Sequence, residues 1–355
     1  MSPFSGLSPS SSRRHDFRSD TGTRPTRRMR DAMRDAEVGD DVCEEDPTVN
    51  RLQELAARMI GKDASLFVPS GTFANQCAIG VLIRPGDEVI VSETAHLVEH
   101  EAGAAAALSG AHVRAVTPTR RSYLTAEDVA PRLRIFEDVH CPRTGLVVLE
   151  NALSDGTVMP VEEMSRVRAL AAAHRVPVHL DGARLFNAAL ALGVDVREIC
   201  AQADTVAFCL SKGLGAPVGS LLSGTAEFVR QARRRRKIMG GGMRQAGVLA
   251  APGIVALTDG LARLEEDHRL ARLLARRLAG IPGVVLDLAS VQTNMVYCHL
   301  RGQGKSEEEL VRFLEQRHIL VYPPSTWGIR FVTSLEVDEE GVEAAVGAVA
   351  DYLTS

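Results

Sequence analysis

Lysine is scarce in this sequence, which makes the position of each lysine informative. The chain has 355 residues, of which 41 are basic, and four of those are lysines: Lys62, Lys212, Lys237 and Lys305. A compositional bias toward alanine and arginine explains the scarcity without reference to function. A lysine in an unusual local context is therefore a stronger functional signal here than it would be in a lysine-rich protein.

Three other features are lacking. The net charge is only −4, which gives no indication of a nucleic acid, a membrane or an acidic partner. The six cysteines are scattered without a C-x-x-C pair, a pattern typical of reduced thiols in a cytoplasmic protein. No stretch is long and apolar enough to span a bilayer, and residues 1–15 lack the apolar core of a signal peptide. We expect a cytoplasmic protein of about two domains with a disordered tail at 1–15.

Short apolar runs alternate with helical patterns from about residue 48 to residue 225. The runs predict strands at 65–68, 88–91, 112–116, 146–150, 176–180, 205–208 and 220–223. The helical patterns include 50–60, 73–82, 162–174 and 185–190. Such alternation indicates an α/β fold, with a mostly parallel sheet flanked by helices on both faces. Ligands of these sheets bind at the carboxyl ends of the strands.

The C-terminal part of the chain has a different pattern. A long helical region covers about 245–279 and follows three consecutive glycines. Beyond it, strands are predicted near 293–299 and 328–333, and helices near 306–317 and 338–353. We therefore divide the chain into a large domain, 16–250, and a smaller C-terminal α+β domain, 251–355.

Lys212 has the context least typical of a surface lysine. It follows the apolar run 205–208 closely and precedes two nearby glycines. Burial beside such a strand favours the neutral amine, which is the form that attacks an aldehyde. The flanking residues of Lys62, Lys237 and Lys305 predict that those three are solvated. The alternative interpretation is that Lys212 is an ordinary surface lysine.

A carboxylate ends the strand predicted at 176–180. An aspartate in the position of Asp181 is more often a helix N-cap, and here it could cap a helix that begins near Ala183. Together with Lys212 it offers what a pyridoxal phosphate (PLP) enzyme needs. The lysine holds the aldehyde as an imine, and the carboxylate keeps the pyridine nitrogen protonated. The pair predicts a PLP site.

The segment 69–72 joins a predicted strand to the helix predicted at 73–82. Free backbone N–H groups and a hydroxyl at a helix N-terminus bind phosphate without a large cluster of cations. Gly71 and Thr72 are therefore candidate phosphate ligands. Simple capping of the helix by serine or threonine is the alternative.

His96 and Arg184 are further candidates for the same cleft. His96 begins a predicted helix just after the strand at 88–91 and could stack on a cofactor ring, although a lone histidine is more often structural. Arg184 follows Asp181 closely enough to face the same site, and its alternative interpretation is an exposed helix residue.

A dense basic run, Arg233–Lys237, precedes Gly240–Gly242 and Arg244. Charge runs of this kind are usually solvated faces. The glycines beside Arg244 suggest a mobile loop that reaches a phosphate, in the same or in a neighbouring subunit.

Together these features resemble the threonine aldolase branch of the fold-type I PLP enzymes, also called the β-eliminating lyase family. The resemblance runs from about Phe17 to the C-terminus and rests on nine motifs in order. They are Arg18–Thr21, Val38–Asp41, Glu45–Thr48, Pro69–Thr72, His179–Asn187, Cys209–Gly213, Gly240–Gly247, Thr293–Met295 and Ile329–Thr333.

The resemblance implies a role for each cofactor-binding candidate. Lys212 would hold the cofactor as an imine, Asp181 would pair with the ring nitrogen, and His96 would stack over the ring. Members of the family are typically homotetramers with sites at subunit interfaces, so phosphate ligands would come from two subunits. These ligands would be Gly71, Thr72, Lys237 and Arg244.

The resemblance also implies how the substrate is held. Ser19 and Arg330 would bind its carboxylate, while Arg184 would reach the carboxylate or the phenolic oxygen of the ring. His100 occupies a position that is aromatic in the family, and we expect it near the substrate.

The sequence departs from the family at the substrate's side chain. The usual Asp-Asp-Val-Tyr-Gly is here Asp-Asp-Val-Cys-Glu, with Cys43 in place of the tyrosine. Leu153 replaces a histidine expected near the β-hydroxyl, and Ser334 replaces a histidine near the C-terminus. The cofactor and carboxylate ends of the site are intact, whereas the end that handles the side chain is altered.

We therefore predict a PLP-dependent aldehyde-lyase of amino acid metabolism, which cleaves an L-threonine-like β-hydroxy-α-amino acid to glycine and an aldehyde. His96 or His100, directly or through water, would be the base. The alternatives within PLP chemistry are racemisation, β-elimination and aldol condensation. Outside it, the alternatives are a non-enzymatic PLP-fold protein or a nucleic-acid binder using Arg233–Arg236. The Asp181–Lys212 pair argues against the first and the acidic charge balance against the second.

Overall fold

The computed structural model describes residues 13–355 except 120–121, 137 and 303. Most of the tail predicted at 1–15 lies outside the described residues. Its last residues are placed against the C-terminal part of the chain: Arg13 forms ion pairs with Asp338 and Glu340, and His15 begins a short strand, β1 (His15–Asp16).

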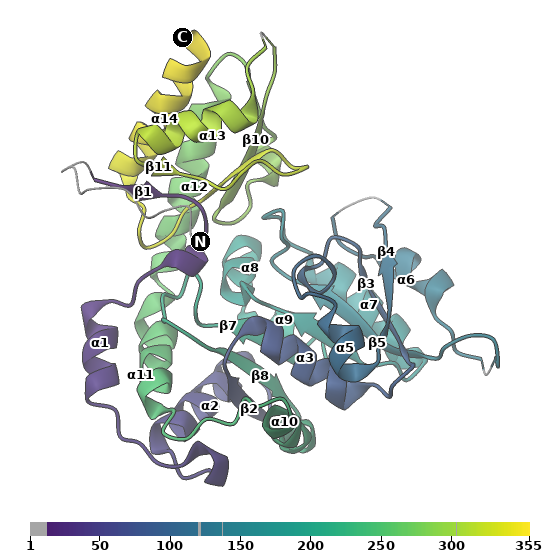
Figure 1. Ribbon diagram of the computed structural model, residues 1–355. Coiled ribbons are helices and arrows are strands. Elements are labelled where there is room, and N and C mark those ends of the chain that lie inside the picture. The colour runs from purple at the N-terminus through teal and green to yellow at the C-terminus, as the bar shows by residue number, and fades with distance from the viewer. Residues whose placement is uncertain (1–12, 120–121, 137, 303) are drawn as a thin grey trace.

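A seven-stranded sheet forms the centre of the larger part of the molecule (Figure 1). β8 runs antiparallel to both of its neighbours, and the other six strands run in one direction. The predicted mostly parallel sheet is confirmed, and each predicted strand is present within two residues. In spatial order the strands are β2 (Ala64–Val68), β8 (Ser220–Gly224), β7 (Thr205–Cys209), β6 (Val178–Asp181), β5 (Thr144–Glu150), β3 (Glu88–Ser92) and β4 (His112–Val116).

The central strands are buried along almost their whole length because both faces of the sheet are covered. In β3, Ile90 packs into the hydrophobic cluster on one face, while Val89 and Val91 pack into the cluster on the other. This division follows from the alternation of side chains along a strand. Three helices cover one face: α3 (Gly71–Leu82), α5 (Ala104–Ser109) and α10 (Ala226–Ile238). The other face carries α2 (Pro47–Ile60), α7 (Val161–Ala173), α8 (Leu185–Leu192) and α9 (Val196–Cys200).

Short elements connect this framework. The N-terminal ones are η1 (Asp20–Gly22), α1 (Arg27–Arg34) and η2 (Asp41–Cys43). Later ones are α4 (His96–Glu99), α6 (Ala126–Val129) and η3 (Ala130–Arg132).

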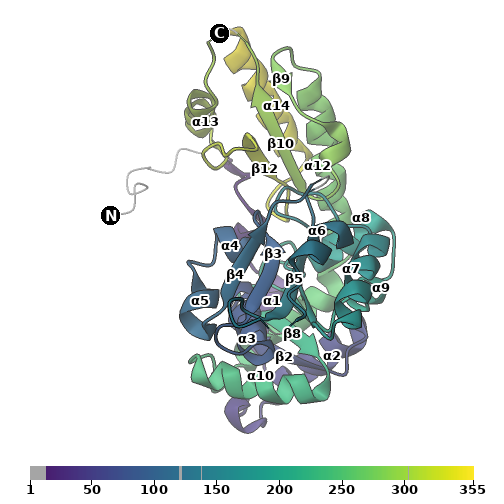
Figure 2. The same ribbon diagram turned by 90° about the vertical axis from the view of Figure 1, so that its right-hand side faces the viewer.

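The C-terminal part has its own hydrophobic core and its own antiparallel sheet. The sheet is visible beside α12 and α14 in Figure 2. The sheet order is β12 (Ile329–Val332), β10 (Met295–Leu300) and β9 (Val284–Val285), with η5 (Leu288–Ser290) between β9 and β10. The helices are α12 (Arg263–Ala279), α13 (Glu307–Gln316) and α14 (Glu339–Thr354). The strands and helices predicted beyond residue 290 are thus present. The pairing of β1 with β11 (Ile319–Leu320) was not predicted, and it brings Phe17 into this C-terminal core. The division at residue 250 remains a prediction.

The long helical region predicted at about 245–279 is present, but it is not one continuous helix. Instead, α11 (Gly247–Val255) leads into a π-helical turn, η4 (Ala256–Gly260), and then into α12. The segments Gly247–Gly260 and Arg263–Ala279 are bent by 65°, and the π-turn directly before the break is a recognised cause of such a bend. Among the described residues no single helix is long and apolar enough to cross a membrane; the bent pair passes that test by length and composition only.

Candidate active site

The candidate residues gather at one edge of the large sheet. Because β2, β3, β5, β6 and β7 are parallel, their carboxyl ends lie at the same edge. Each of these strand ends leads to a residue that could take part in binding or catalysis. β2 leads to Gly71, β3 to His96, and β7 to Lys212, while β5 and β6 end in Glu150 and Asp181.

Lys212 lies half-buried in the turn between β7 and β8. Its carbonyl oxygen accepts a hydrogen bond from Thr23 Oγ1 at 3.0 Å and another from the backbone of Gly215 at 2.8 Å. Gly215 has φ +80°, which explains a glycine at that position. The ammonium lies close enough to Asp20 and His96 to affect the pKa of both. The turn therefore fixes the lysine within reach of two other candidate groups.

The prediction that the other three lysines are solvated is wrong for Lys62. Its Nζ donates to the carbonyl of Ala203 at 2.6 Å, and burial lowers its pKa. Lys62 precedes β2 and Ala203 precedes β7, so this amine lies at the opposite edge of the sheet. Lys237 is exposed, and Lys305 is half-buried with its Nζ 4.9 Å from the centre of the Tyr352 ring.

Asp181 is buried at the end of β6, with 4% of its surface exposed. Its Oδ2 accepts from Asn75 Nδ2 at 2.7 Å and its Oδ1 from the backbone of Ala183 at 3.0 Å. The second bond caps the turn before α8, so a capping role accounts for one oxygen only. A carboxylate has about four acceptor positions, which leaves Asp181 able to accept from a further N–H.

The start of α3 has the character of an anion site. Ser70 is the N-cap and accepts from Phe73 N at 3.2 Å, while Gly71 and Thr72 occupy the first turn. A Cβ on Gly71 would lie 2.8 Å from Cys209 Sγ, so this turn packs directly against the end of β7. A helix N-terminus, a lysine amine and a buried carboxylate at one edge are a donor set that fits PLP.

His96 opens α4 and is held from two sides. Its backbone N–H donates to Glu150 Oε2 at 2.9 Å, and its Nδ1 lies 2.9 Å from Glu101 Oε1. The bond to Glu101 outweighs burial and raises the pKa of His96. The exposed His100 packs edge-on against it, with ring centres 5.5 Å apart.

Arg184 is not an exposed helix residue. Its Nε and Nη2 donate to the two oxygens of the fully buried Asp20, at 2.8 and 2.6 Å. Burial alone would raise the pKa of Asp20, but the charges of Arg184 and Lys212 hold it below its usual value. Such a bidentate pair is geometrically specific. A role for Arg184 toward cofactor or substrate remains a prediction and would use its remaining N–H groups.

The two predicted carboxylate-binding residues lie near the N-terminal segment. Arg330, on β12, donates from Nη2 to the carbonyl of Arg18 at 3.1 Å and faces Tyr297 across the strand pair. Ser19 Oγ accepts from both the backbone and the hydroxyl of Thr21. The structure thus leaves both side chains half-buried, and their binding of a substrate remains a prediction.

The basic run is not a solvated face throughout. Arg236 is buried with its Nη2 2.8 Å from Asp41 Oδ2, and its Nη1 donates to Phe67 O. Arg233 pairs with Glu44, and Arg235 donates to a backbone carbonyl. These internal contacts remove support for the nucleic-acid alternative.

Lys237 and Arg244 do not join the phosphate site in this single chain. Arg244 is exposed and donates to Asp40 Oδ2 at 2.6 Å, and Lys237 lies exposed near the C-terminus of α10. Their action on a phosphate across a subunit interface therefore remains a prediction.

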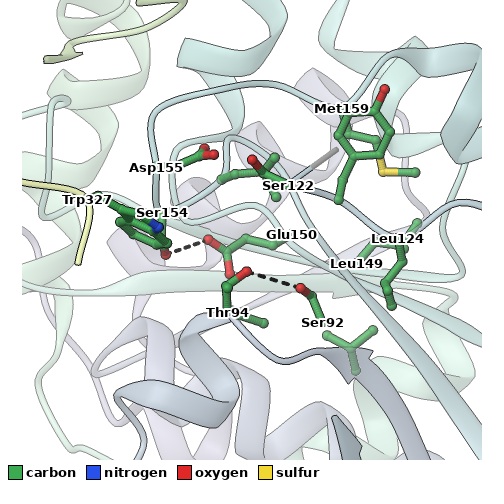
Figure 3. Close-up of a pocket in the computed structure, with 14 residues that line it drawn as sticks. Ser92, Thr94, Ser122, Leu124, Leu149, Glu150, Ser154, Asp155, Met159 and Trp327 are labelled. Atoms are coloured by element: carbon green, nitrogen blue, oxygen red, sulfur yellow. Dashed lines mark hydrogen bonds between the residues drawn. The ribbon is translucent and has the colours of Figure 1, made fainter. Parts of the chain in front are cut away.

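A pocket lined by Glu150 contains one of the three positions at which the sequence departs from the family, Leu153. Glu150 accepts from Ser154 Oγ at 2.8 Å, and Figure 3 shows Thr94 on its other side and Trp327 beside Ser154. The buried Leu153 also lines this pocket. Burial and the charge of Asp181 raise the pKa of Glu150 to about 7.

The other two altered positions lie elsewhere. Cys43 is exposed at the end of η2, before α2. Ser334 is buried, and its carbonyl accepts from Arg263. In the part of the chain that the structure describes, neither residue forms a hydrogen bond with Lys212 or Asp181.

Asp267, on α12 and close enough to Asp20 to feel its charge, is expected to make the free energy of unfolding depend on pH. It is fully buried with Arg263 Nη2 at 3.4 Å, and burial raises its pKa to about 7. The folded protein therefore binds a proton that the unfolded chain loses near pH 4, so stability falls as the pH rises from about 4 to 7. We expect Asp267→Asn to stabilise the protein by on the order of 3 kcal/mol at pH 8 and hardly at all near pH 4.

Urea unfolding at several pH values measures this difference. Asp259→Asn is the matched control, because Asp259 pairs with Arg28 at the surface. An Asp267→Asn difference that does not grow with pH would contradict the prediction.

Sequence reasoning missed four residues of the site. Asp20 lies within a recognised motif and Glu150 ends a predicted strand, but neither received a role. Asn75 and Glu101 carried no signal, since an asparagine inside a helix and a glutamate in a loop are ordinary residues. Only the folded arrangement brings them together.

Comparison with known proteins identifies the family. The β-eliminating lyase family matches residues 16–301. The chain is 42% identical over 344 residues to the probable low-specificity L-threonine aldolase 2 of Arabidopsis thaliana, covering 95% of this chain and 96% of that protein. It is 41% identical over 325 residues to the low specificity L-threonine aldolase of Escherichia coli, covering 92% and 95%.

Solved structures share the fold at lower identity. A threonine aldolase from Leishmania major superposes with a TM-score of 0.82 at 22% identity, covering 96% of this chain and all of that one. A serine palmitoyltransferase from Sphingomonas wittichii gives 0.75 at 17% identity, covering 96% and 87%. These likenesses confirm the fold-type I architecture. On the family match and the extent of its sequence identity, this chain belongs to the β-eliminating lyase family.

Proposed function

We propose that this protein is a PLP-dependent aldolase that cleaves L-threonine-like β-hydroxy-α-amino acids to glycine and an aldehyde. The observation that carries the proposal is the meeting of Lys212, Asp181 and the start of α3 at the carboxyl edge of the sheet. The names of relatives at about 42% identity over 95% of the chain support the substrate class.

Each residue has a defined task. Bound PLP supplies an aldehyde carbon that amines attack and a cationic ring that accepts the electrons of the breaking bond. Lys212 supplies the primary amine, and Asp181 accepts from the pyridine N–H. The backbone N–H groups of Gly71 and Thr72 bind the phosphate.

The remaining residues act on the substrate. Arg330, with Ser19, holds the carboxylate, which orients the Cα–Cβ bond for cleavage. His96 takes the β-hydroxyl proton as the aldehyde leaves, and Cα then gains a proton to give glycine. The cleavage moves one proton from the hydroxyl and returns one to Cα, so it needs no oxidant or reductant. General-base help of this kind contributes on the order of 10²–10⁴-fold.

A panel of amino acids tests the reaction type. We expect L-threonine and phenylserine to yield glycine and the matching aldehyde in equal amounts. Pyruvate from L-serine would indicate β-elimination, and D-alanine from L-alanine would indicate racemisation. Glycine condensing with an aldehyde faster than cleavage proceeds would instead point to synthesis. If either pyruvate or D-alanine is the dominant product, the proposal is wrong.

The assembly and location are also part of the proposal. A homotetramer would bring Lys237 and Arg244 of one subunit to the phosphate of another. A cytoplasmic location accords with six free cysteines. Analytical ultracentrifugation measures the number of subunits, and fractionation of the source cells measures the location.

A further inference from the structure

Glu101 is a buried carboxylate with an unusual set of partners. Its side chain is fully buried, and it accepts from Asn75 Nδ2 at 2.8 Å and from Gln76 Nε2 at 2.6 Å. Its third partner is His96 Nδ1 at 2.9 Å. Within the described residues no lysine or arginine pairs with Glu101, so His96 is the one partner that can offset its charge, and it does so when the imidazole is protonated. A buried charge needs such compensation, which ties the state of Glu101 to that of His96.

Asn75 joins this pair to Asp181. Its Nδ2 donates to Glu101 Oε1 at 2.8 Å and to Asp181 Oδ2 at 2.7 Å. An amide nitrogen has two hydrogens, so each carboxylate receives one. Turning the amide over would place its oxygen against two carboxylates. The bridge therefore has one stable orientation.

The orientation of Asn75 is also fixed from behind. Its Oδ1 lies 3.1 Å from His179 Nε2, and His179 Nδ1 lies 2.8 Å from Thr205 Oγ1. Burial lowers the pKa of His179 to about 4, so the ring is neutral. Its Nε2 hydrogen then points to Asn75, and its Nδ1 accepts from the threonine hydroxyl.

The arrangement decides which nitrogen of His96 faces the reactants. Because Nδ1 donates its hydrogen to Glu101, Nε2 is the nitrogen left for chemistry. The charged groups that face this imidazole come from four elements. They are Glu101 after α4, Asp181 on β6, Glu150 on β5 and Lys212 after β7, together with His100 at the end of α4.

We propose that Glu101 and Asn75 are positioning residues, which hold His96 with Nε2 toward the reacting atoms and link its proton affinity to Asp181. The inference rests on the proposed function, since it assigns His96 to the substrate. Glu101 acts through the imidazole and Asn75 through the two carboxylates, and neither needs to touch the substrate.

The test measures His96 directly in the full-length protein. Exchange of the imidazole Cε1 hydrogen for deuterium, followed by peptide mass spectrometry, gives the titration midpoint of each histidine, and fragment ions separate His96 from His100. In the wild type, with and without PLP, we expect the His96 midpoint to lie above about 6.5. Glu101→Gln should lower it by about one pH unit.

The matched control is Glu99→Gln, an exposed glutamate on the same short helix, and we expect no change from it. Asn75→Leu should raise the midpoint, because both carboxylates lose a donor and become more basic. Shifts of opposite sign are not expected from general loosening of the fold. In the loaded enzyme, the acidic limb of the kcat/KM profile for L-threonine should move with the Glu101→Gln midpoint.

Three results would overturn the inference: a wild-type midpoint at or below 6.5, a Glu101→Gln midpoint equal to that of Glu99→Gln, or shifts of the same sign in the Glu101 and Asn75 variants. The wild-type measurement needs no variant to fold. If the protein does not cleave L-threonine but the midpoints shift as expected, the proposed function fails while the positioning network stands.

Discussion

Lys212→Ala is expected to reduce cleavage of L-threonine by at least about 10³-fold, the largest effect of any substitution considered. The amine of Lys212 lies at the carboxyl edge of the sheet, near Asp20 and His96. Without it, this edge loses the primary amine that would hold the cofactor covalently. The measurement is aldehyde release at saturating substrate and cofactor.

Lys62→Ala is the matched control for this result. Lys62 is also half-buried, but its amine donates to Ala203 at the opposite edge of the sheet. We expect its loss to affect stability modestly and cleavage hardly at all. Equal losses of activity in the two variants, with both folded, would contradict the assignment of Lys212.

Asp181→Asn is expected to lower kcat by on the order of 10²–10³-fold, which is the magnitude typical of losing one preorganised electrostatic contact. The substitution keeps the shape of the side chain and removes the charge that would stabilise a protonated pyridine ring. It also leaves Asn75 Nδ2 facing an amide instead of a carboxylate. Cofactor affinity should fall in parallel, as measured by PLP titration.

Asp204→Asn serves as the control for this substitution. Asp204 accepts from the backbone of Val178 at 2.8 Å, at the opposite edge of the same two strands. It carries the same charge without facing the site. An Asp181→Asn enzyme with wild-type kcat would show that this carboxylate is only a cap for the turn at Ala183.

Strand-end reasoning predicted much of the site because it depends on local pattern. The run before Lys212 is buried on both faces, so its apolar character was visible in the sequence. Asp181 and His96 were found in the same way, as polar residues just after buried strands. The fold followed from the regular alternation of these runs with helices.

The contacts that the sequence did not predict join residues far apart along the chain. Asp20 pairs with Arg184, which lies 164 residues further along the chain. Asp41 is buried against Arg236, and no local sequence pattern predicts that ion pair. The pairing of β1 with β11 involves two residues on each side, too few for a hydrophobic period. Asn75 bridges Asp181 and Glu101 only because α3, β6 and the loop after α4 meet.

The central claim is that Lys212 holds PLP at the carboxyl edge of the sheet. Reduction of the PLP-loaded wild-type protein with borohydride, followed by proteolysis and peptide mass spectrometry, tests it most directly. We predict one pyridoxyl group per chain, located on Lys212, and none when Lys212→Ala is treated in the same way. A label on Lys62, Lys237 or Lys305, or no label on a protein that still cleaves L-threonine, would contradict the account.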